Sequence, residues 1–281
     1  MPELPEVETV RRTLEPVIVG KRIERCAVCH HRALPQNNAD EFCRSLYRRT
    51  ITGIMRRGKY LIISLDQKLE LVAHLRMTGQ LIYRPKQDLP LQKHVSARFW
   101  FENNGELRFV DQRKFGTLYL VKKGNYGHIR GLITLGPEPL SSEFTWEVLA
   151  DGVRSVRAIK TILLDQTKVA GLGNIYADEA LYRAGIHPLK PGACLSDSEI
   201  EALHSSIVAV LKEAIANHGT TIRDYRTGSG DTGSFQNKLE VYRRTGKPCG
   251  NCGTLIEKIK VGGRGTHFCP NCQRWDPGCM D

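Results

Sequence analysis

The chain has 281 residues, 41% hydrophobic and 25% charged, a composition typical of a folded protein of about two domains. Lys and Arg outnumber Asp and Glu by 41 to 30, for a formal net charge of +11, so we expect a polyanionic partner, most simply nucleic acid. The sequence contains neither an apolar run of about eighteen residues nor a secretion signal, which argues against a membrane location and predicts a cytoplasmic protein.

The first ten residues, MPELPEVETV, combine two prolines with three glutamates. Apolar residues then recur at helical spacing, which predicts a helix from about Pro5 to Val19 that ends at Gly20. Carboxylates in the first turn of a helix complement the helix dipole, which is one explanation of the acidic start.

A second explanation is chemical and depends on the removal of Met1. Processing would leave Pro2 with a free secondary amine, and α-amino groups titrate near pH 7.7 to 8.0, well below lysine. Such an amine is a nucleophile at neutral pH, and neighbouring carboxylates could hold it and transfer protons. While Met1 is attached, the Pro2 nitrogen is an amide and cannot attack.

Between Lys59 and Val121 the sequence consists of short β-rich runs: KYLIISL, LELVAHL, QLIYR, VSARFWF, ELRFV and GTLYLV. Turn signals such as Asn104-Gly105 separate them. Strands that follow one another without intervening helices form antiparallel sandwiches or barrels. We therefore predict an N-terminal β domain over residues 1–134, followed by a proline-rich linker over residues 135–150.

Beyond the linker the periodicity is helical, and residues 151–237 are predicted to form a second domain. Ser196 and Glu199 make a capping box, and apolar residues follow at helical spacing up to Gly219. A glycine-rich turn places Asn174 at a helix start, where free backbone N–H groups favour an anion. Residues 220–237 lack apolar periodicity and are rich in glycine and threonine, which predicts a functional loop.

The cysteines near the C-terminus form two C-x-x-C pairs separated by residues 253–268, the spacing of a four-thiolate zinc site: Cys249, Cys252, Cys269 and Cys272. Four sulfur ligands leave no open position, so the one zinc ion is expected to be structural. The intervening residues indicate a hairpin with GGRG at its tip, which would present Arg264 to a phosphate or a base edge. We assign residues 238–275 to this zinc finger and residues 276–281 to a tail.

Six segments together resemble the bacterial formamidopyrimidine-DNA glycosylases, in the same order over nearly the whole chain: MPELPEVETVRRTL, RRGKYL, HLRMTGQL, DQRKFG, KVAGLGNIYADEALYRAGIHP and VGGRGTHFCPNCQ. The resemblance implies an α+β fold: an antiparallel β-sandwich with flanking helices, a helix-two-turns-helix domain and a β-hairpin zinc finger. It also implies a nucleoid-associated bacterial enzyme of base-excision repair, a monomer without a small-molecule cofactor. The implied substrate is double-stranded DNA that contains abasic sites or oxidised purines, namely 8-oxoguanine and formamidopyrimidines.

The resemblance also implies catalytic roles. Pro2 matches the Schiff-base nucleophile that attacks C1′, Glu3 the general acid and base, and Glu6 a supporting carboxylate. Lys59 matches the proton donor of β-elimination, and Arg264 that of δ-elimination. The enzyme would therefore be both a glycosylase and an abasic-site lyase.

Further positions match residues that hold the DNA around an extruded nucleotide. Met77, Arg113 and Phe115 match the residues that fill the vacated space, although Met77 and Phe115 would otherwise be assigned to the core. The expected DNA contacts come from His94, Arg113, Lys160, Asn174, Tyr242 and Arg264. The loop of about residues 220–237 matches a lesion-capping loop.

Two alternatives remain open at this stage. The endonuclease VIII branch shares the architecture but prefers oxidised pyrimidines, and Leu4 argues against it because that branch typically has glycine there. A non-enzymatic zinc-ribbon protein that binds DNA would explain the charge and the cysteines without a reactive amine.

Overall fold

The computed structural model describes residues 1–35, 38–86, 93–102 and 104–276, so that nearly all of the predicted tail lies outside the described residues. The chain divides into two compact units. The first comprises Met1–Ile133 and Asn217–Gln236, and the second comprises Thr134–Ala216 and Asn237–Asp281.

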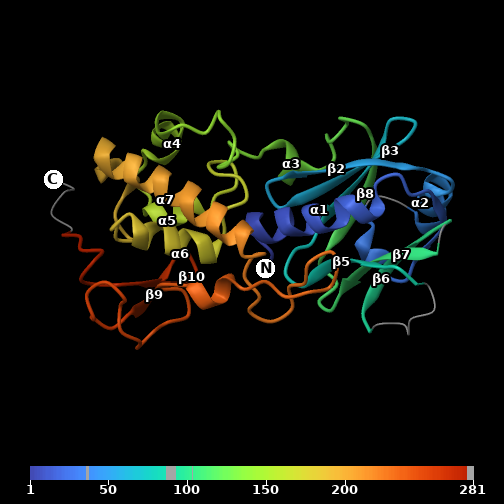
Figure 1. The fold of residues 1–281 in the computed structure, drawn as a ribbon. Helices are drawn as coiled ribbons and strands as arrows, with labels where there is room; N and C mark the ends of the chain where they lie inside the picture. Colours follow the sequence, from blue (N-terminus) through green and yellow to red (C-terminus); the bar gives the residue numbers. More distant parts are fainter. Residues whose placement is uncertain (36–37, 87–92, 103, 277–281) are drawn as a thin grey trace. The chain divides into compact units, whose positions relative to one another are not determined.

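Two four-stranded antiparallel sheets build the first unit (Figure 1). One has the strand order β2-β3-β4-β8, with β2 at Ile51–Arg57, β3 at Tyr60–Leu65, β4 at Leu69–His74 and β8 at Thr117–Lys122. The other has the order β1-β6-β7-β5, with β1 at Ile23–Val28, β6 at Val95–Phe101, β7 at Gly105–Asp111 and β5 at Gly79–Arg84. The predicted antiparallel sandwich is confirmed.

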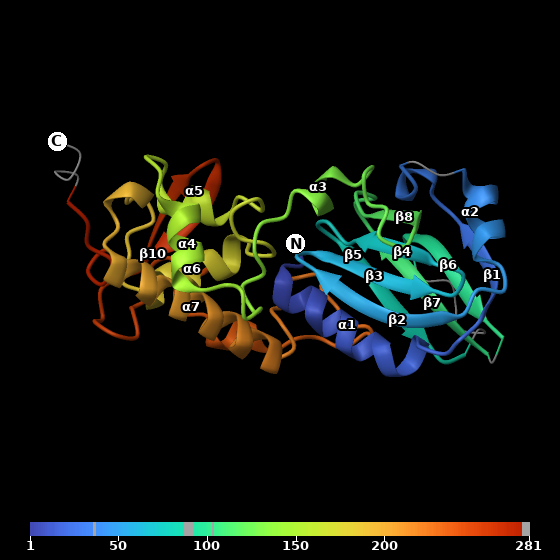
Figure 2. The same ribbon diagram turned by 90° about the horizontal axis from the view of Figure 1, so that it is seen from above.

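The core of the first unit lies between these sheets and beneath two helices, α1 at Leu4–Ile18 and α2 at Ala39–Leu46. Alternate residues of each strand point inward, as in β6, where Phe99 and Phe101 are buried in the core. Helix α1 adds Val7, Val10 and Leu14 from one face and packs against β2 (Figure 2). The predicted helix is confirmed to within one residue at each end.

Among the described residues of the first unit, two strands and two α-helices were not predicted: β1, β2, α2 and the short helix α3 at Arg130–Ile133. Charged residues interrupt the alternation in IERCAV and ITGIMRR, and β2 also contains Gly53, so the apolar signal of a half-buried strand is weak there. The six strands expected between residues 59 and 121 are all present as β3 to β8.

In its described residues the second unit contains four α-helices, α4 at Trp146–Val153, α5 at Ile159–Leu163, α6 at Asn174–Arg183 and α7 at Asp197–Ala216. The short helix α3, at Arg130–Ile133, belongs to the first unit. The predicted capping box is confirmed, because Ser196 N donates to Glu199 Oε2 at 2.9 Å and Glu199 N donates to Ser196 Oγ at 3.2 Å. None of the helices in the described ranges is both long enough and apolar enough to span a bilayer.

The hairpin of the second unit consists of β9 at Glu257–Val261 and β10 at Arg264–Phe268. Short 3-10 helices lie at His31–Ala33, Gly192–Cys194 and Phe235–Lys238. Helix α4 begins inside the segment expected to be a linker, where the Thr145 hydroxyl accepts a hydrogen bond from Val148 N at 3.4 Å.

The sequence predicts that the loop of residues 220–237 is part of the helical domain. In the structure, the contacts of Asn217–Gln236 place this segment in the first unit instead. Gly228 N donates to Thr13 Oγ1 of α1 at 2.8 Å, and Tyr83 N of β5 donates to the Gly228 carbonyl at 2.8 Å. Tyr225 is buried among core residues. These long-range contacts, which no local pattern encodes, decide the assignment.

Candidate functional site

The N-terminus is built into the start of α1. Pro2 is buried, and Glu3 is the N-cap of the helix, with 3% of its surface exposed. Glu3 N donates to Glu6 Oε2 at 2.7 Å, and the Glu3 side chain caps the Glu6 N–H in return. The acidic start therefore does stabilise the helix, and the same bonds fix two carboxylates beside Pro2.

Glu6 also holds the Asn217–Gln236 segment. Its Oε1 accepts a hydrogen bond from Thr220 N at 2.7 Å, and its carbonyl accepts one from the Tyr225 hydroxyl at 3.3 Å. Burial, together with the nearby Glu6 carboxylate, raises the pKa of Tyr225, which keeps the phenol protonated and able to donate. A single glutamate, only 1% exposed, thus joins the N-terminus to the loop.

The close approach of this loop requires glycine at position 219, which leads to a prediction about stability. Gly219 has φ +76°, and a Cβ there would lie 2.8 Å from Glu6 Oε1. A left-handed alanine costs about 1 to 2 kcal/mol, and loss of a hydrogen bond to a carboxylate adds about 1.5 to 3 kcal/mol. We expect Gly219→Ala to lower the free energy of unfolding by roughly 3 kcal/mol, measured by urea denaturation.

The matched control for this measurement is Gly124→Ala. Gly124 has φ +78°, and a Cβ there would have nothing within 4 Å, so only the backbone cost of about 1 to 2 kcal/mol applies. Equal losses for the two variants would show that Glu6 does not constrain the loop.

Lys59 lies at the tip of the β2–β3 hairpin. Arg57 pairs with Tyr60, so Gly58 and Lys59 form a two-residue turn, and Gly58 has φ +53°. A positive φ at the first turn residue is typical of the type II′ hairpin turn and favours glycine. Lys59 is only 6% exposed.

Arg56 and Glu8 secure this turn against α1. The Arg56 guanidinium donates through Nη1 to the Gly58 carbonyl at 3.1 Å and through Nε to Glu8 Oε2 at 3.1 Å. Burial opposes ionisation of Glu8, but hydrogen bonds from Arg11 and Arg12 and the charge of Arg56 hold its pKa below the usual value. The clamp ties the Lys59 turn to the helix that begins beside Pro2.

The three residues expected to enter the DNA lie in two exposed loops. Met77 is 37% exposed between β4 and β5, and Phe115 is 53% exposed between β7 and β8, so neither is a core residue. The Arg113 guanidinium carbon lies 4.9 Å from the centre of the Phe115 ring. His94, also exposed, adjoins the same edge, because its carbonyl accepts a hydrogen bond from Asp111 N at 2.9 Å.

The second unit brings together Asn174 and the hairpin that carries Arg264. Gly173 is the N-cap of α6, so Asn174 is the first residue of that helix, as predicted. Its Nδ2 donates to the Gly265 carbonyl at 2.9 Å. Gly262 and Gly263 both have positive φ, as a two-residue type I′ turn requires, and exposed Arg264 follows at the start of β10.

Lys160 departs from the expectation of a direct phosphate contact. Its side chain is 0% exposed, forms a buried ion pair with Asp178 and donates through Nζ to the Asn174 carbonyl at 3.0 Å. Asp178 Oδ2 also accepts hydrogen bonds from His267 N at 3.0 Å and from His267 Nδ1 at 3.1 Å. In this structure Lys160 therefore joins α5, α6 and β10 rather than facing solvent.

Tyr242 is half-buried beside this network. Its ring contacts that of His267 edge to face, with centroids 5.0 Å apart. Its backbone N donates to Glu179 Oε1 at 2.8 Å, and the same carboxylate accepts hydrogen bonds from the N–H groups of Glu240 and Val241. The start of the finger is thus anchored to α6.

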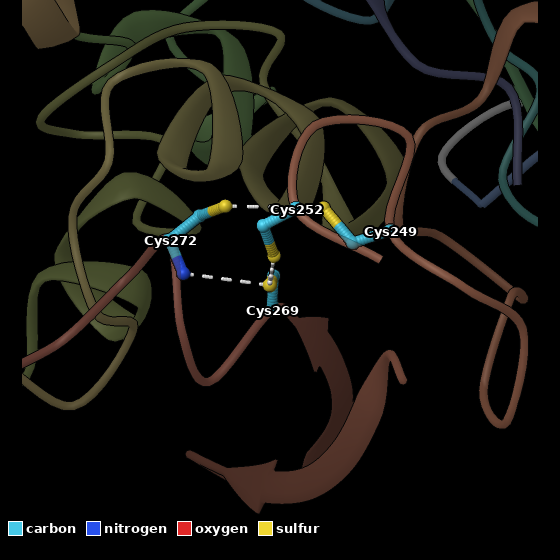
Figure 3. Close-up of side chains that lie close together, drawn as sticks. All are labelled: Cys249, Cys252, Cys269 and Cys272. Carbon is cyan, nitrogen blue, oxygen red and sulfur yellow. Dashed lines mark hydrogen bonds between the residues drawn. The ribbon is translucent and has the colours of Figure 1, made fainter. Parts of the chain in front are cut away.

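The four predicted zinc ligands converge, as Figure 3 shows, with their sulfur atoms all within 4.8 Å of one another. The Cys249 and Cys272 sulfurs are 3.8 Å apart, and those of Cys252 and Cys269 are 3.5 Å apart. Zn–S bonds of about 2.3 Å in a tetrahedron put sulfur atoms about 3.8 Å apart, so the cluster fits one zinc ion. Within the described ranges, no other group of three or more potential ligands converges in this way.

Sequence reasoning missed the residues that position these side chains, chiefly Glu8, Arg56 and Asp111. The roles of these residues depend on partners distant in sequence, and no local spacing signals them.

Comparisons with known proteins agree with this architecture. Residues 1–118 match the family model "Formamidopyrimidine-DNA glycosylase N-terminal domain", residues 135–226 the H2TH domain of the same glycosylase, and residues 246–274 the "Zinc finger found in FPG and IleRS". A formamidopyrimidine-DNA glycosylase of Geobacillus kaustophilus is 48% identical, covering 98% of this chain and 100% of the relative. A formamidopyrimidine-DNA glycosylase of Listeria monocytogenes is 45% identical, covering 98% of this chain and 100% of the relative.

Solved structures show the same similarity. A Lactococcus lactis FPG mutant in complex with DNA that contains Fapy-dG has a TM-score of 0.91 and 44% identity, covering 98% of this chain and 100% of its own. The wild-type Lactococcus lactis FPG in complex with DNA that contains an oxidised pyrimidine has a TM-score of 0.90 and 43% identity, covering 98% of this chain and 100% of its own.

Proposed function

The chain belongs to the formamidopyrimidine-DNA glycosylase family and is a DNA glycosylase with a zinc finger, and from this premise we propose that it excises oxidised purines and then cleaves the DNA strand. The proposed substrates are 8-oxoguanine and formamidopyrimidines in duplex DNA, as well as abasic sites. The observation that carries the proposal is the burial of Pro2 beside the mutually bonded Glu3 and Glu6.

We propose that Pro2, freed of Met1, attacks C1′ of the damaged nucleotide and displaces the base. The Pro2 nitrogen loses its proton on attack. Opening of the deoxyribose ring then breaks the C1′–O4′ bond, O4′ takes up a proton, and C1′ and the Pro2 nitrogen are left joined as an iminium. This iminium carries a positive charge without protonation, so it withdraws electrons and acidifies C2′. Glu3 then serves as the acid and base on the deoxyribose, while Glu6 keeps Glu3 and the capping loop in place.

Elimination completes the proposed reaction. Loss of the C2′ proton expels the 3′ phosphate, with Lys59 as the proton donor, and a second elimination expels the 5′ phosphate, with Arg264 as the donor. The product is a one-nucleotide gap. The Glu8–Arg56 clamp supports this assignment, because it holds the Lys59 turn against the helix that begins beside Pro2.

For DNA binding, we propose that His94, Asn174, Tyr242 and Arg264 contact phosphates, and that buried Lys160 acts by holding Asn174 at the start of α6. Arg113 would bond the base left unpaired, with Met77 and Phe115 filling the vacated space. We also propose that the protein acts as a monomer on the DNA of a bacterial nucleoid.

The test is a comparison of single-turnover excision from duplexes with 8-oxoguanine opposite cytosine and with thymine glycol. We expect faster release of 8-oxoguanine and a gapped product. The pyrimidine duplex is the informative control, because a relative has been solved with oxidised-pyrimidine DNA. Faster release of thymine glycol would overturn the proposed substrate class, and Glu3→Gln should lose excision while retaining DNA binding.

A further inference from the structure

The two loops that carry Met77, Arg113 and Phe115 are neighbours because of the sheet topology. Residues 75–78 cross from β4 in one sheet to β5 in the other, and residues 112–116 cross back from β7 to β8. Strand β4 pairs with β8 through His74 and Thr117, and β5 pairs with β7 through Gly79 and Asp111. Both crossover loops therefore leave the sandwich at the same edge.

A buried carboxylate joins the two loops. Asp111 is 1% exposed, and its Oδ1 accepts a hydrogen bond from the Thr78 hydroxyl at 2.5 Å and one from Arg113 N at 3.2 Å. Its Oδ2 accepts a hydrogen bond from Gly116 N at 2.6 Å. Since a buried carboxyl group needs hydrogen-bond partners, these bonds allow Asp111 to hold both ends of the 112–116 loop to the first loop.

The Thr78 hydroxyl is both a hydrogen-bond donor and a hydrogen-bond acceptor. It donates to Asp111 and accepts a hydrogen bond from Arg113 N at 3.0 Å. Thr78 directly follows Met77 in the chain and is 8% exposed. One hydroxyl thus links Thr78, the residue next to Met77, to the backbone of Arg113.

Both loops contain backbone conformations that are unfavourable for residues other than glycine. Arg76 has φ +54° and Lys114 has φ +59°, so each loop holds a non-glycine residue in the left-handed region. Such residues persist where the surrounding structure compensates for their strain. Gly116 fits only as glycine, because a Cβ there would lie 2.5 Å from the Phe109 ring. Phe115, the residue before Gly116, is 53% exposed.

We propose that Thr78 and Asp111 form a hydrogen-bonded bracket that preorganises Met77, Arg113 and Phe115 as one unit, making Thr78 a positioning residue for opposite-base discrimination. The inference rests on the proposed function, which places these three residues in the DNA. A preformed unit does not have to be ordered during insertion. The free energy of the Arg113 contacts with the opposite base is therefore not reduced by the entropy cost of ordering the loops. Without the bracket, the two loops order separately and discriminate less.

The experiment compares Thr78→Val, which keeps the shape but removes the hydroxyl, with Thr78→Ser, which keeps the hydroxyl. The measurement is the ratio of single-turnover excision of 8-oxoguanine opposite cytosine to that opposite adenine. Insertion is followed separately by a fluorescent cytosine analogue opposite the lesion. We expect Thr78→Val to lower the ratio and the insertion rate by roughly ten-fold, as the loss of a buried hydrogen bond implies, and Thr78→Ser to restore both to within about three-fold of the parent.

The outcomes separate this inference from the proposed function. If the parent protein excises no 8-oxoguanine, the proposed function fails. If the parent excises it and Thr78→Val keeps the parental ratio and insertion rate, the bracket alone is wrong. Should Thr78→Val not fold, Thr78→Ala against Thr78→Ser provides the same comparison, and equal ratios for these two variants would also overturn the bracket.

Discussion

Protein that retains Met1 will form no covalent adduct when it is mixed with lesion-bearing DNA and borohydride, whereas protein that begins at Pro2 will be trapped efficiently. Borohydride reduction joins protein to DNA only through an imine or iminium, and an amide nitrogen forms neither because its lone pair is delocalised into the carbonyl group. We expect adduct formation to fall by roughly a thousand-fold or more, since the proposed covalent step is removed entirely.

The sharpest comparison uses one preparation before and after processing. Protein synthesised with a blocked deformylase keeps formyl-Met1, and treatment with deformylase and methionine aminopeptidase then exposes Pro2, which intact mass spectrometry verifies. Pro2→Gly provides a second arm, because it keeps a terminal amine while losing the secondary-amine character. An equal adduct yield before and after processing would move the nucleophile to another amine, with Lys59 the first to examine.

Loss of one zinc ligand, tested as Cys269→Ser, will unfold the finger and lower DNA affinity by about a hundred-fold. The apolar core beneath the finger is small and consists of Val241, Cys249, Ile256 and Cys269 together with Tyr182 of α6. Structural zinc contributes about 10 to 16 kcal/mol in isolated fingers, far more than such a core supplies. Without the metal, Arg264 and Tyr242 lose their fixed positions, and buried Asp178 loses its His267 partner.

Three readouts distinguish this effect from a general loss of folding. Zinc content should fall to zero, limited proteolysis should cut within residues 238–275, and the dependence of log affinity on log salt should become shallower by nearly one unit per lost phosphate contact. Cys29→Ser is the matched control, because Cys29 is an exposed thiol of the first unit outside the cluster. Full zinc content and unchanged affinity in Cys269→Ser would contradict the structural role of the metal.

Local spacing was sufficient for the features that depend on neighbours in the chain. The period of apolar residues predicted α1, the strands β3 to β8 and the capping box of α7, because these patterns report which face of an element is buried. The four cysteines needed only their spacing, since each C-x-x-C pair offers two thiolates to one ion. The glycine pair before Arg264 likewise indicated its own turn.

Only the tertiary structure decided which of these elements share a site. It enclosed Lys160 with Asp178, tied Asn217–Gln236 to the first unit through Glu6, and exposed Met77 and Phe115 although their residue types suggested the core. It also joined Thr78 to Asp111 across two loops. These relations arise from strand register and from hydrogen bonds between residues far apart in the chain, and the sequence pattern around each residue is the same whether or not its distant partner is present.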